Sequence, residues 1–278
     1  MAQSGTVNVV GFQIRSAAGA CAALLLLAGC ASPQSAPEDS PDAVTGPVVV
    51  FAAASLTEAF PALGEDFETE HPGANVTFNF GSSAALAQQI AAGAPADVFA
   101  AANQAALGVV SEAGQVVGEP AVFARNSLRI AVPAGNPAGI TGLADFARRD
   151  LTVALCAPEV PCGVLSARVF EAAGITPAPD TLEQDVKAAL VKVERDEVDC
   201  ALVYRTDIDA ARGAVDGIDF PGSADVVTEY PIATLQAAPN PAGARAFTDL
   251  VLSAGGRERL AAAGFDAAGP GDAGPGVG

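Results

Sequence analysis

The chain has 278 residues, of which 50% are hydrophobic and 17% charged, so it is long enough for two domains with a large core. Such a composition excludes disorder for the bulk of the chain. There are 32 acidic residues and 14 basic ones, a net charge of −18, which leaves no basic face for nucleic acid. A catalytic triad, a zinc enzyme or a histidine general base would each depend on the single histidine, His71. Most hydrolase functions are therefore disfavoured.

Residues 1–29 have the composition of an export signal. They contain one base, Arg15, no acid, and an apolar run that is too short to span a bilayer, which needs about 20 residues. The run ends in Leu27-Ala28-Gly29-Cys30, which looks like a bacterial lipobox, so we expect Cys30 to carry a lipid. The alternative is ordinary signal cleavage near Ala31. The lipidated protein would sit on the extracytoplasmic face of the cell membrane.

Two low-complexity segments flank the rest of the chain. Residues 30–46, rich in Ser, Pro, Ala and Asp, are expected to form a flexible tether. Residues 267–278, nearly all Gly, Ala, Pro and Asp, are expected to form a disordered tail. The folded body then covers about residues 47–266, and we expect no further membrane-spanning segment in it.

Short apolar runs alternate with helical patterns through this body. Strands are expected at 48–52, 75–80, 98–100, 128–132, 151–155, 201–204 and 226–233. Helices are expected from about 53 to 71, from about 83, from about 163 to 173, from about 185, and within 242–263. In the first helix, Ser55 and Glu58 have the spacing of a capping box. In the helix from Asp185, four apolar residues fall at i, i+3, i+4 and i+7: Val186, Ala189, Leu190 and Val193.

This alternation predicts an α/β fold with mostly parallel sheets flanked by helices. We expect two lobes joined by hinge strands. The first lobe would comprise residues 47–126 and 226–266, and the second residues 127–225. A ligand would bind in the cleft between them, near strand C-termini and helix N-termini.

Polar groups gather where strands lead into helices. Ser55 follows the first strand, Ser82-Ser83 follow the second, and Pro161-Cys162-Gly163 and Asp185-Val186 each precede a helix. A helix N-terminus offers unpaired N–H groups and the positive end of a dipole, so it binds anions without any Lys or Arg. Each serine taken alone is as well explained by helix capping. Sequence spacing does not show that these junctions meet.

A set of short sequence motifs occurs in a characteristic order over about residues 47–265. The set comprises Phe51–Thr57, Phe80–Ala87, Gly93–Phe99, Asn126–Leu128, Pro158–Gly163, Asp185-Val186, Val193–Arg195, Val203-Tyr204 and Glu229–Pro231. Any one of these motifs is weak, but in this order they resemble the periplasmic molybdate-binding proteins of ABC importers. The resemblance implies the two-lobed fold of type II periplasmic binding proteins. Such a protein closes on a tetrahedral oxyanion and delivers it to an ABC permease and its ATPase.

The same resemblance implies the ligand set. The oxyanion would be held by the hydroxyls of Ser55 and Ser83, the backbone N–H groups of Cys162 and Val186, and the Tyr204 hydroxyl. Cys162 stands where the family usually has alanine, which leaves the N–H in place. The ligand would be molybdate, and also tungstate, and it would leave the site chemically unchanged. The resemblance therefore implies no catalytic residue, no cofactor and no metal ion other than the molybdenum of the anion. It also implies that the protein is a monomer.

The remaining candidates receive structural interpretations. Tyr230 is expected to pack near a hinge, and His71 to lie at the surface or cap the end of a helix. Asp97 and Glu159 are interpreted as turn or interface carboxylates, because a carboxylate repels an anion.

Three cysteines, Cys156, Cys162 and Cys200, remain after export, into a compartment where disulfides persist. Cys156 and Cys162 flank one short loop between a strand and a helix. Cys200 begins the strand that ends at Tyr204, and parallel packing would place it about 13 Å from Cys156, beyond the Cα limit of about 7 Å for a bridge. We therefore expect a disulfide between Cys156 and Cys162. Two free thiols are the alternative.

Three other functions compete with the molybdate hypothesis. A binder of sulfate, phosphate or ferric ion would share the fold, although ferric binders usually show adjacent tyrosines and this chain has none. A hydrolase built on Ser55 or Ser83 would lack both a Gly-x-Ser-x-Gly motif and a suitable histidine. A structural or adhesive surface lipoprotein is the third alternative.

Overall fold

The computed structural model describes residues 44–268. The predicted signal peptide, the lipidation site Cys30, nearly all of the tether and most of the tail lie outside the described residues. Between residues 44 and 268, no helix combines the length and the apolarity needed to cross a membrane.

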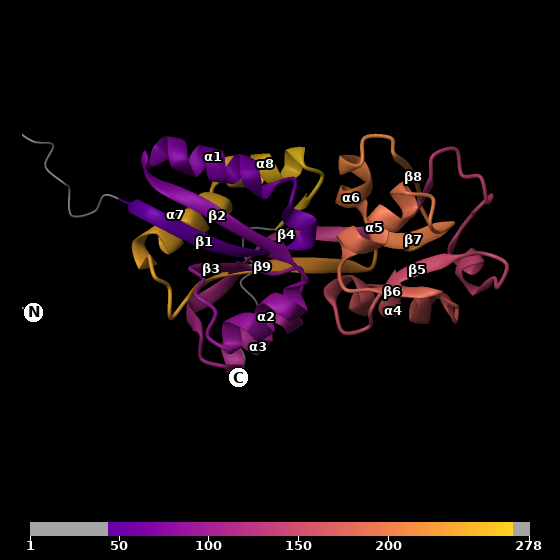
Figure 1. The fold of residues 1–278 in the computed structure, drawn as a ribbon, viewed down its shortest axis with the longest axis horizontal. Coiled ribbons are helices and arrows are strands. Elements are labelled where there is room, and N and C mark those ends of the chain that lie inside the picture. The colour runs from indigo at the N-terminus through magenta and orange to yellow at the C-terminus, as the bar shows by residue number, and fades with distance from the viewer. Residues whose placement is uncertain (1–43, 269–278) are drawn as a thin grey trace, which may run out of the picture. The chain divides into compact units, whose positions relative to one another are not determined.

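Strands and helices alternate through the described chain (Figure 1). The strands are β1 (Thr45–Ala53), β2 (Gly73–Gly81), β3 (Val98–Ala100), β4 (Val116–Pro133), β5 (Val153–Cys156), β6 (Thr181–Glu183), β7 (Cys200–Tyr204), β8 (Val215–Ile218), β9 (Val227–Leu235) and β10 (Asp266–Ala267). The α-helices are α1 (Phe60–Glu70), α2 (Ser83–Ala91), α3 (Gln104–Glu112), α4 (Pro161–Ala173), α5 (Val186–Glu194), α6 (Arg205–Ala210), α7 (Pro241–Leu252) and α8 (Ala254–Ala262). Two 3₁₀ turns, η1 (Ala54–Leu56) and η2 (Leu143–Ala147), complete the set.

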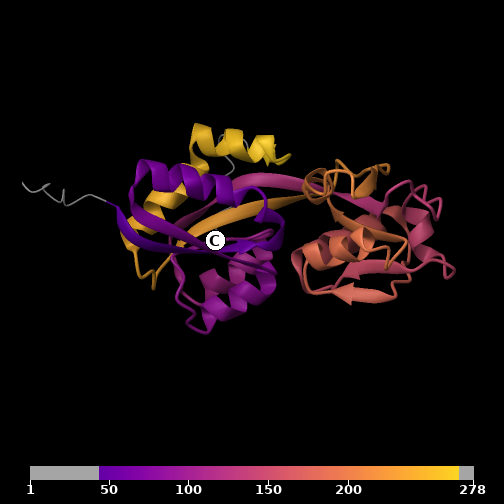
Figure 2. The same cartoon turned by 45° about the horizontal axis from the view of Figure 1, so that its top comes forward.

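Helices cover both faces of the first lobe's sheet, in which β1 pairs in parallel with β2 and β3. Side chains alternate between the faces of a strand, and in β1 Val48, Val50 and Ala52 pack with α1 and α7. Phe51 packs on the other face, with α2 and α3. Both views show α1 and α8 on one side of this sheet and α2 and α3 on the other (Figures 1 and 2). Burial on both faces explains why β1 is a continuous apolar run.

The second lobe has its own core, built on β5, β6 and β7. β5 pairs in parallel with β6 and β7, while β7 pairs antiparallel with the C-terminal part of β4. The predicted apolar stripe of α5, from Val186 to Val193, is buried in this core together with the apolar face of α4.

Two long strands connect the lobes. β4 and β9 pair antiparallel from Val116↔Leu235 to Ser127↔Val227, and β4 then continues into the second lobe as far as Pro133. The resulting strand order is β2-β1-β3-β9-β4-β7-β5-β6. The predicted two-lobed α/β fold with hinge strands is confirmed. Because β9 and β4 run antiparallel to their neighbours, the sheet is mixed, and parallel pairing is confined to β1–β3 and β5–β7.

Several local predictions were wrong. Ser55 does not cap an α-helix, because residues 54–56 form a 3₁₀ turn and α1 begins only at Phe60. The strand expected at 128–132 is the end of an 18-residue strand, whose earlier part is broken by a register shift between Val117 and Ala121.

The boundaries of the ordered body also differ from the prediction. Thr45, assigned to the tether, already pairs with Gly73, and its carbonyl accepts a hydrogen bond from the Asn240 side chain. Ala267, assigned to the tail, pairs with Ala124. Backbone pairing orders both residues although their side chains contribute little to the core.

Candidate anion-binding site

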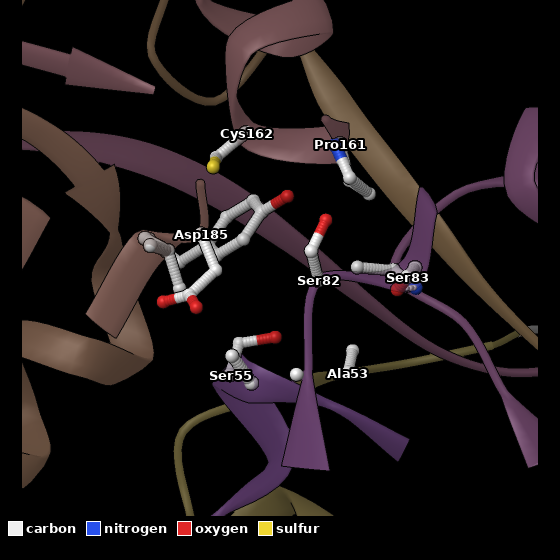
Figure 3. Close-up of a pocket in the computed structure, with 12 residues that line it drawn as sticks. Ala53, Ser55, Ser82, Ser83, Pro161, Cys162 and Asp185 are labelled. Carbon is white, nitrogen blue, oxygen red and sulfur yellow. Dashed lines mark hydrogen bonds between the residues drawn. The ribbon is translucent and has the colours of Figure 1, made fainter. Parts of the chain in front are cut away.

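A small cavity lies between the two lobes, where strands end and helices begin (Figure 3). It is lined by Ala53, Ala54, Ser55, Gly81, Ser82, Ser83, Ala102, Pro161, Cys162, Asp185, Val186 and Tyr204. All five positions predicted to bind the oxyanion are among them. The cavity has a volume of about 20 Å³, where a single water needs about 10–15 Å³. It is small and opens toward solvent.

Three helices start at this cavity. Ser83 is the first residue of α2, Cys162 the second of α4, and Val186 the first of α5. The first-turn N–H groups of a helix have no intrahelical partner, and they coincide with the positive end of the helix dipole. Pro161, the first residue of α4, has no N–H, so Cys162 carries the first amide hydrogen of that helix. The backbone thus provides positive potential without a basic side chain.

Ser55 lies in the 3₁₀ turn that follows β1 and is 4% exposed. Its Oγ lies 2.9 Å from the hydroxyl oxygen of Tyr230, a fully buried residue on β9. If Tyr230 donates in this pair, the Ser55 hydroxyl hydrogen is free for a ligand. Tyr230, interpreted from sequence as packing near a hinge, therefore also fixes the position of a cavity hydroxyl.

Ser83 is held by a different contact. Its Oγ accepts a hydrogen bond of 3.0 Å from the backbone N–H of Ala102, which follows β3. Since the oxygen is used as an acceptor, its hydrogen remains available to donate. The two predicted serines are thus anchored by separate elements of the same lobe.

Tyr204 ends β7 and reaches the cavity from the second lobe. It is 1% exposed, and its hydroxyl has no hydrogen-bond partner among the described residues. Burial raises the pKa of the phenol well above its ordinary value, and the neighbouring Tyr230 and Asp207 add to the effect. The group is therefore a neutral phenol at physiological pH, and it can donate a hydrogen bond to an anion.

Asp185 is the one carboxylate in the lining. It is the N-cap of α5, and its Oδ1 accepts a hydrogen bond of 2.9 Å from the Ala188 N–H. The carboxylate thus caps the start of the helix, a role that Asp commonly fills. Among the described residues, no group of three or more His, Cys, Asp or Glu side chains is placed to hold a metal ion.

The predicted disulfide between Cys156 and Cys162 is present, with a Cα–Cα distance of 5.7 Å. It joins the end of β5 to the first turn of α4 and closes the loop that presents the Cys162 N–H. The same loop approaches Gly163 so closely that a Cβ there would collide with the Ala157 carbonyl oxygen. Cys200 is buried and free, and it pairs with Val153, three residues before Cys156. That register keeps Cys200 away from the bridge.

An ion-pair network lies beside the cavity and crosses between the lobes. Lys187, the residue after Val186, contacts Glu58 at 2.7 Å and the fully buried Asp207 at 2.8 Å. Asp207 also accepts a hydrogen bond from the Tyr204 N–H at 3.2 Å, so it positions the end of β7. Sequence reasoning missed this network, because Lys187 on α5 and Glu58 in the turn before α1 carry no signal in the sequence that they meet.

Burial controls the charge state of Asp207. Desolvation raises the pKa of this carboxyl to about 6, even though Lys187 acts in the opposite direction. The pKa of Lys187 is raised in turn: burial lowers it, but the two carboxylates of Asp207 and Glu58 outweigh that effect.

Two grooves adjoin the cavity and share different lining residues with it. One, of about 430 Å³, runs between α2 and α3 of the first lobe and the start of α4, and shares Ser82 and Pro161 with the cavity. The other, of about 440 Å³, lies between η1, α6 and the end of α8, and shares Ser55. Beside this second groove, Arg205 donates to the Gly264 carbonyl and pairs with Asp266, which gives a second polar link between the lobes.

The other sequence interpretations can now be compared with the structure. Asp97 is fully buried in the first lobe and accepts hydrogen bonds from the Val49 and Asn240 N–H groups, which is a structural role. Glu159 is exposed beside the first groove. His71 caps α1 through its backbone N–H, which donates to Phe67.

The two lobes and the cavity of neutral donors between them have the arrangement of a protein that captures a small solute. The chain belongs to the family of bacterial extracellular solute-binding proteins, whose model matches residues 48–266. It is 42% identical over 241 residues to the molybdate-binding protein ModA of Mycobacterium tuberculosis, covering 87% of this chain and 92% of that protein. It is 33% identical over 221 residues to ModA of Escherichia coli, covering 73% and 82%. The resemblance found in the sequence is thereby confirmed.

Solved structures share the fold at lower identity. The periplasmic molybdate-binding protein of Azotobacter vinelandii superposes with a TM-score of 0.66 at 19% identity, covering 80% of this chain and all of that one. The sulfate-binding protein SubI of M. tuberculosis superposes with a TM-score of 0.68 at 18% identity, covering 81% and 88%. The fold alone therefore does not distinguish these two anions.

The disulfide generates the first prediction. Closing a loop of about seven residues contributes about 2 kcal/mol on the chain-entropy estimate, so reduction should lower the melting temperature by about 4–8 °C. Scanning calorimetry with and without reductant measures this shift. A Cys156→Ala/Cys162→Ala double variant should show no response to reductant, and a Cys200→Ala variant should respond as the parent does. An unchanged melting temperature in fully reduced parent protein would contradict the expectation.

The raised pKa of Asp207 generates the second prediction. A carboxyl whose pKa rises on folding from 3.8 to about 6 favours the folded state while it is protonated. This contribution is complete below pH 3.8 and is lost as the pH rises through 6, for a total of about 3 kcal/mol. Asp207→Asn removes the titration, so the stability of the variant relative to the parent should increase between pH 4 and pH 7. Denaturant unfolding across that range tests it, and a constant difference would show that Asp207 titrates normally.

Proposed function

We propose that this protein is an extracytoplasmic substrate-binding lipoprotein that captures molybdate, and also tungstate, for an ABC-type permease. The observation that carries the proposal is the cavity itself, in which three helix N-termini and the hydroxyls of Ser55, Ser83 and Tyr204 converge from both lobes. Every one of these donors is neutral. The names of the curated relatives support molybdate as the anion among those that such a cavity would accept.

The proposed mechanism is capture by closure. The first lobe presents Ser55 and Ser83, and the second presents the N–H groups of Cys162 and Val186 together with the Tyr204 hydroxyl. An anion between them would receive hydrogen bonds from both lobes and so favour the closed arrangement. No bond in the anion is made or broken. The lipid on Cys30 would keep the monomeric binding protein next to its permease.

Neutral donors suit an anion in a protein of net charge −18. Long-range repulsion by the acidic surface is screened beyond about 8–10 Å at physiological salt. The helix dipoles and hydroxyls would act at contact distance on an anion held between the lobes, where hydrogen bonds to charge are strong.

Sulfate is the second candidate, because the sulfate-binding protein SubI shares the fold to the same degree as the molybdate-binding structures. The two anions have the same charge and shape, but the bonds of sulfate are shorter. A donor shell of fixed spacing leaves some donors unpaired around the smaller anion, and each unpaired buried donor costs affinity.

Two substitutions test the donor set. Hydrogen bonds to charged groups contribute about 1.5–3 kcal/mol each, so Ser55→Ala and Tyr204→Phe should each weaken molybdate binding by about 10- to 100-fold. Isothermal titration calorimetry measures the effect, with Ser111→Ala on the exposed side of α3 as a control that should bind like the parent. If both site variants kept the parental affinity, neither residue would belong to the site.

Anion selectivity provides a separate test. A ligand that binds only the folded state raises its melting temperature by mass action. Molybdate and tungstate should therefore produce a clear thermal shift, whereas sulfate at the same concentration should produce little. Equal shifts for molybdate and sulfate would argue for a general oxyanion binder, and a shift for sulfate alone would replace the molybdate assignment.

A further inference from the structure

Ser82 stands at the N-cap of α2 but does not cap it. Its backbone has φ −57° and ψ 125°, and its side chain makes no hydrogen bond to the first turn of the helix. A serine at this position ordinarily accepts from an N–H two or three residues later. Other helix starts in the same chain follow that rule: Asn103 accepts from Ala106, Asp185 from Ala188 and Ser253 from Gly256. The hydroxyl of Ser82 is therefore directed elsewhere.

The Ser82 hydroxyl points into the cavity. Ser82 is 9% exposed and lines the space together with Ser55, Ser83 and Tyr204. Figure 3 shows its hydroxyl pointing across the cavity, toward the first turn of α4 where Pro161 and Cys162 lie. Its Oγ is buried and has no hydrogen-bond partner among the described residues, a property that it shares with the Tyr204 hydroxyl. A buried hydroxyl without a hydrogen-bond partner lowers the stability of the fold.

The neighbouring serine has a different status. The Oγ of Ser83 is already engaged by the Ala102 N–H, whereas the Oγ of Ser82 has neither a donor nor an acceptor. The two adjacent hydroxyls are thus not equivalent. The free one belongs to the residue for which the sequence predicted no ligand contact.

We propose that the Ser82 hydroxyl donates a hydrogen bond to the bound oxyanion and is a sixth binding position, beyond the five that the sequence predicted. The inference rests on the proposed function, because it takes the cavity to hold an oxyanion. A hydroxyl that has no hydrogen-bond partner among the described residues would gain a charged acceptor when the anion binds. The hydrogen bond to the anion would then offset the stability that α2 forgoes because the Ser82 side chain does not cap it.

The test compares Ser82→Ala with the parent, using molybdate in calorimetric titrations and thermal melts of the anion-free protein. We expect affinity to fall by about 10-fold or more. The melting temperature of the anion-free variant should stay the same or rise, because removing an unpaired buried hydroxyl does not destabilise the fold. Ser111→Ala serves as the matched control, with parental affinity.

The opposite pattern would overturn the proposal. If Ser82 acts as a helix cap in solution, Ser82→Ala should lower the anion-free melting temperature by about 2–4 °C and leave the affinity unchanged. Ser82→Gly separates the two roles, because glycine is nearly as good an N-cap as serine but has no hydroxyl. It should lose as much affinity as the alanine variant, and retained affinity would refute the contact. A parental protein that does not bind molybdate would refute the proposed function instead.

Discussion

The antiparallel ladder between β4 and β9 is the interaction on which the rest of the structure depends. It runs from Val116 to Ser127 on one strand and from Val227 to Leu235 on the other, and it joins the sheets of both lobes. The ladder places the carboxyl end of β1 in one lobe opposite the carboxyl end of β7 in the other. Helix N-termini and hydroxyls from separate cores meet in one cavity for this reason.

The charge balance of the cavity follows from that geometry. A basic side chain in the lining would attract many anions, but it would also need to be desolvated and paired when the cavity is empty. Peptide dipoles and hydroxyls carry a smaller desolvation cost and are fixed by the backbone. Ser83 is held by Ala102, Ser55 by Tyr230, and the Cys162 N–H by a disulfide-bridged loop. Each donor is thus positioned before any ligand arrives, which favours binding of one size of anion.

The sequence predicted the fold well because its signals are local. Short apolar runs with both faces buried identified β1, β3 and β7, and the i, i+3, i+4, i+7 stripe identified α5. Most of β4 was missed because Gly118, Pro120 and Arg125 interrupt its apolar pattern. The Ser55–Glu58 spacing was misread as a cap because the same spacing occurs where a 3₁₀ turn directs the serine into a cavity.

The site was predictable only in part, for a related physical reason. Convergence of the junctions is a property of the tertiary fold, and it was anticipated only through the resemblance to known binding proteins. The partners that anchor the donors lie far away in sequence: Tyr230 for Ser55, Ala102 for Ser83, and Lys187 with Asp207 for the end of β7. The Cys156–Cys162 bridge was predictable because both residues belong to one short loop.

The two grooves beside the cavity differ in what binds their walls together. The groove at η1 and α6 is bordered by Lys187–Glu58 and by Arg205 with Gly264 and Asp266. Across the groove between α2 and α4, no hydrogen bond or ion pair described for residues 44–268 joins the first-lobe wall to the second-lobe wall. Four residues of its first-lobe wall are alanines: Ala84, Ala85, Ala105 and Ala106. Separating the two walls of this groove therefore breaks no hydrogen bond or ion pair that is described for residues 44–268, whereas separating the lobes at η1 and α6 breaks several. The number of described polar contacts that hold the lobes together is therefore smaller along the alanine-lined groove than along the groove at η1 and α6.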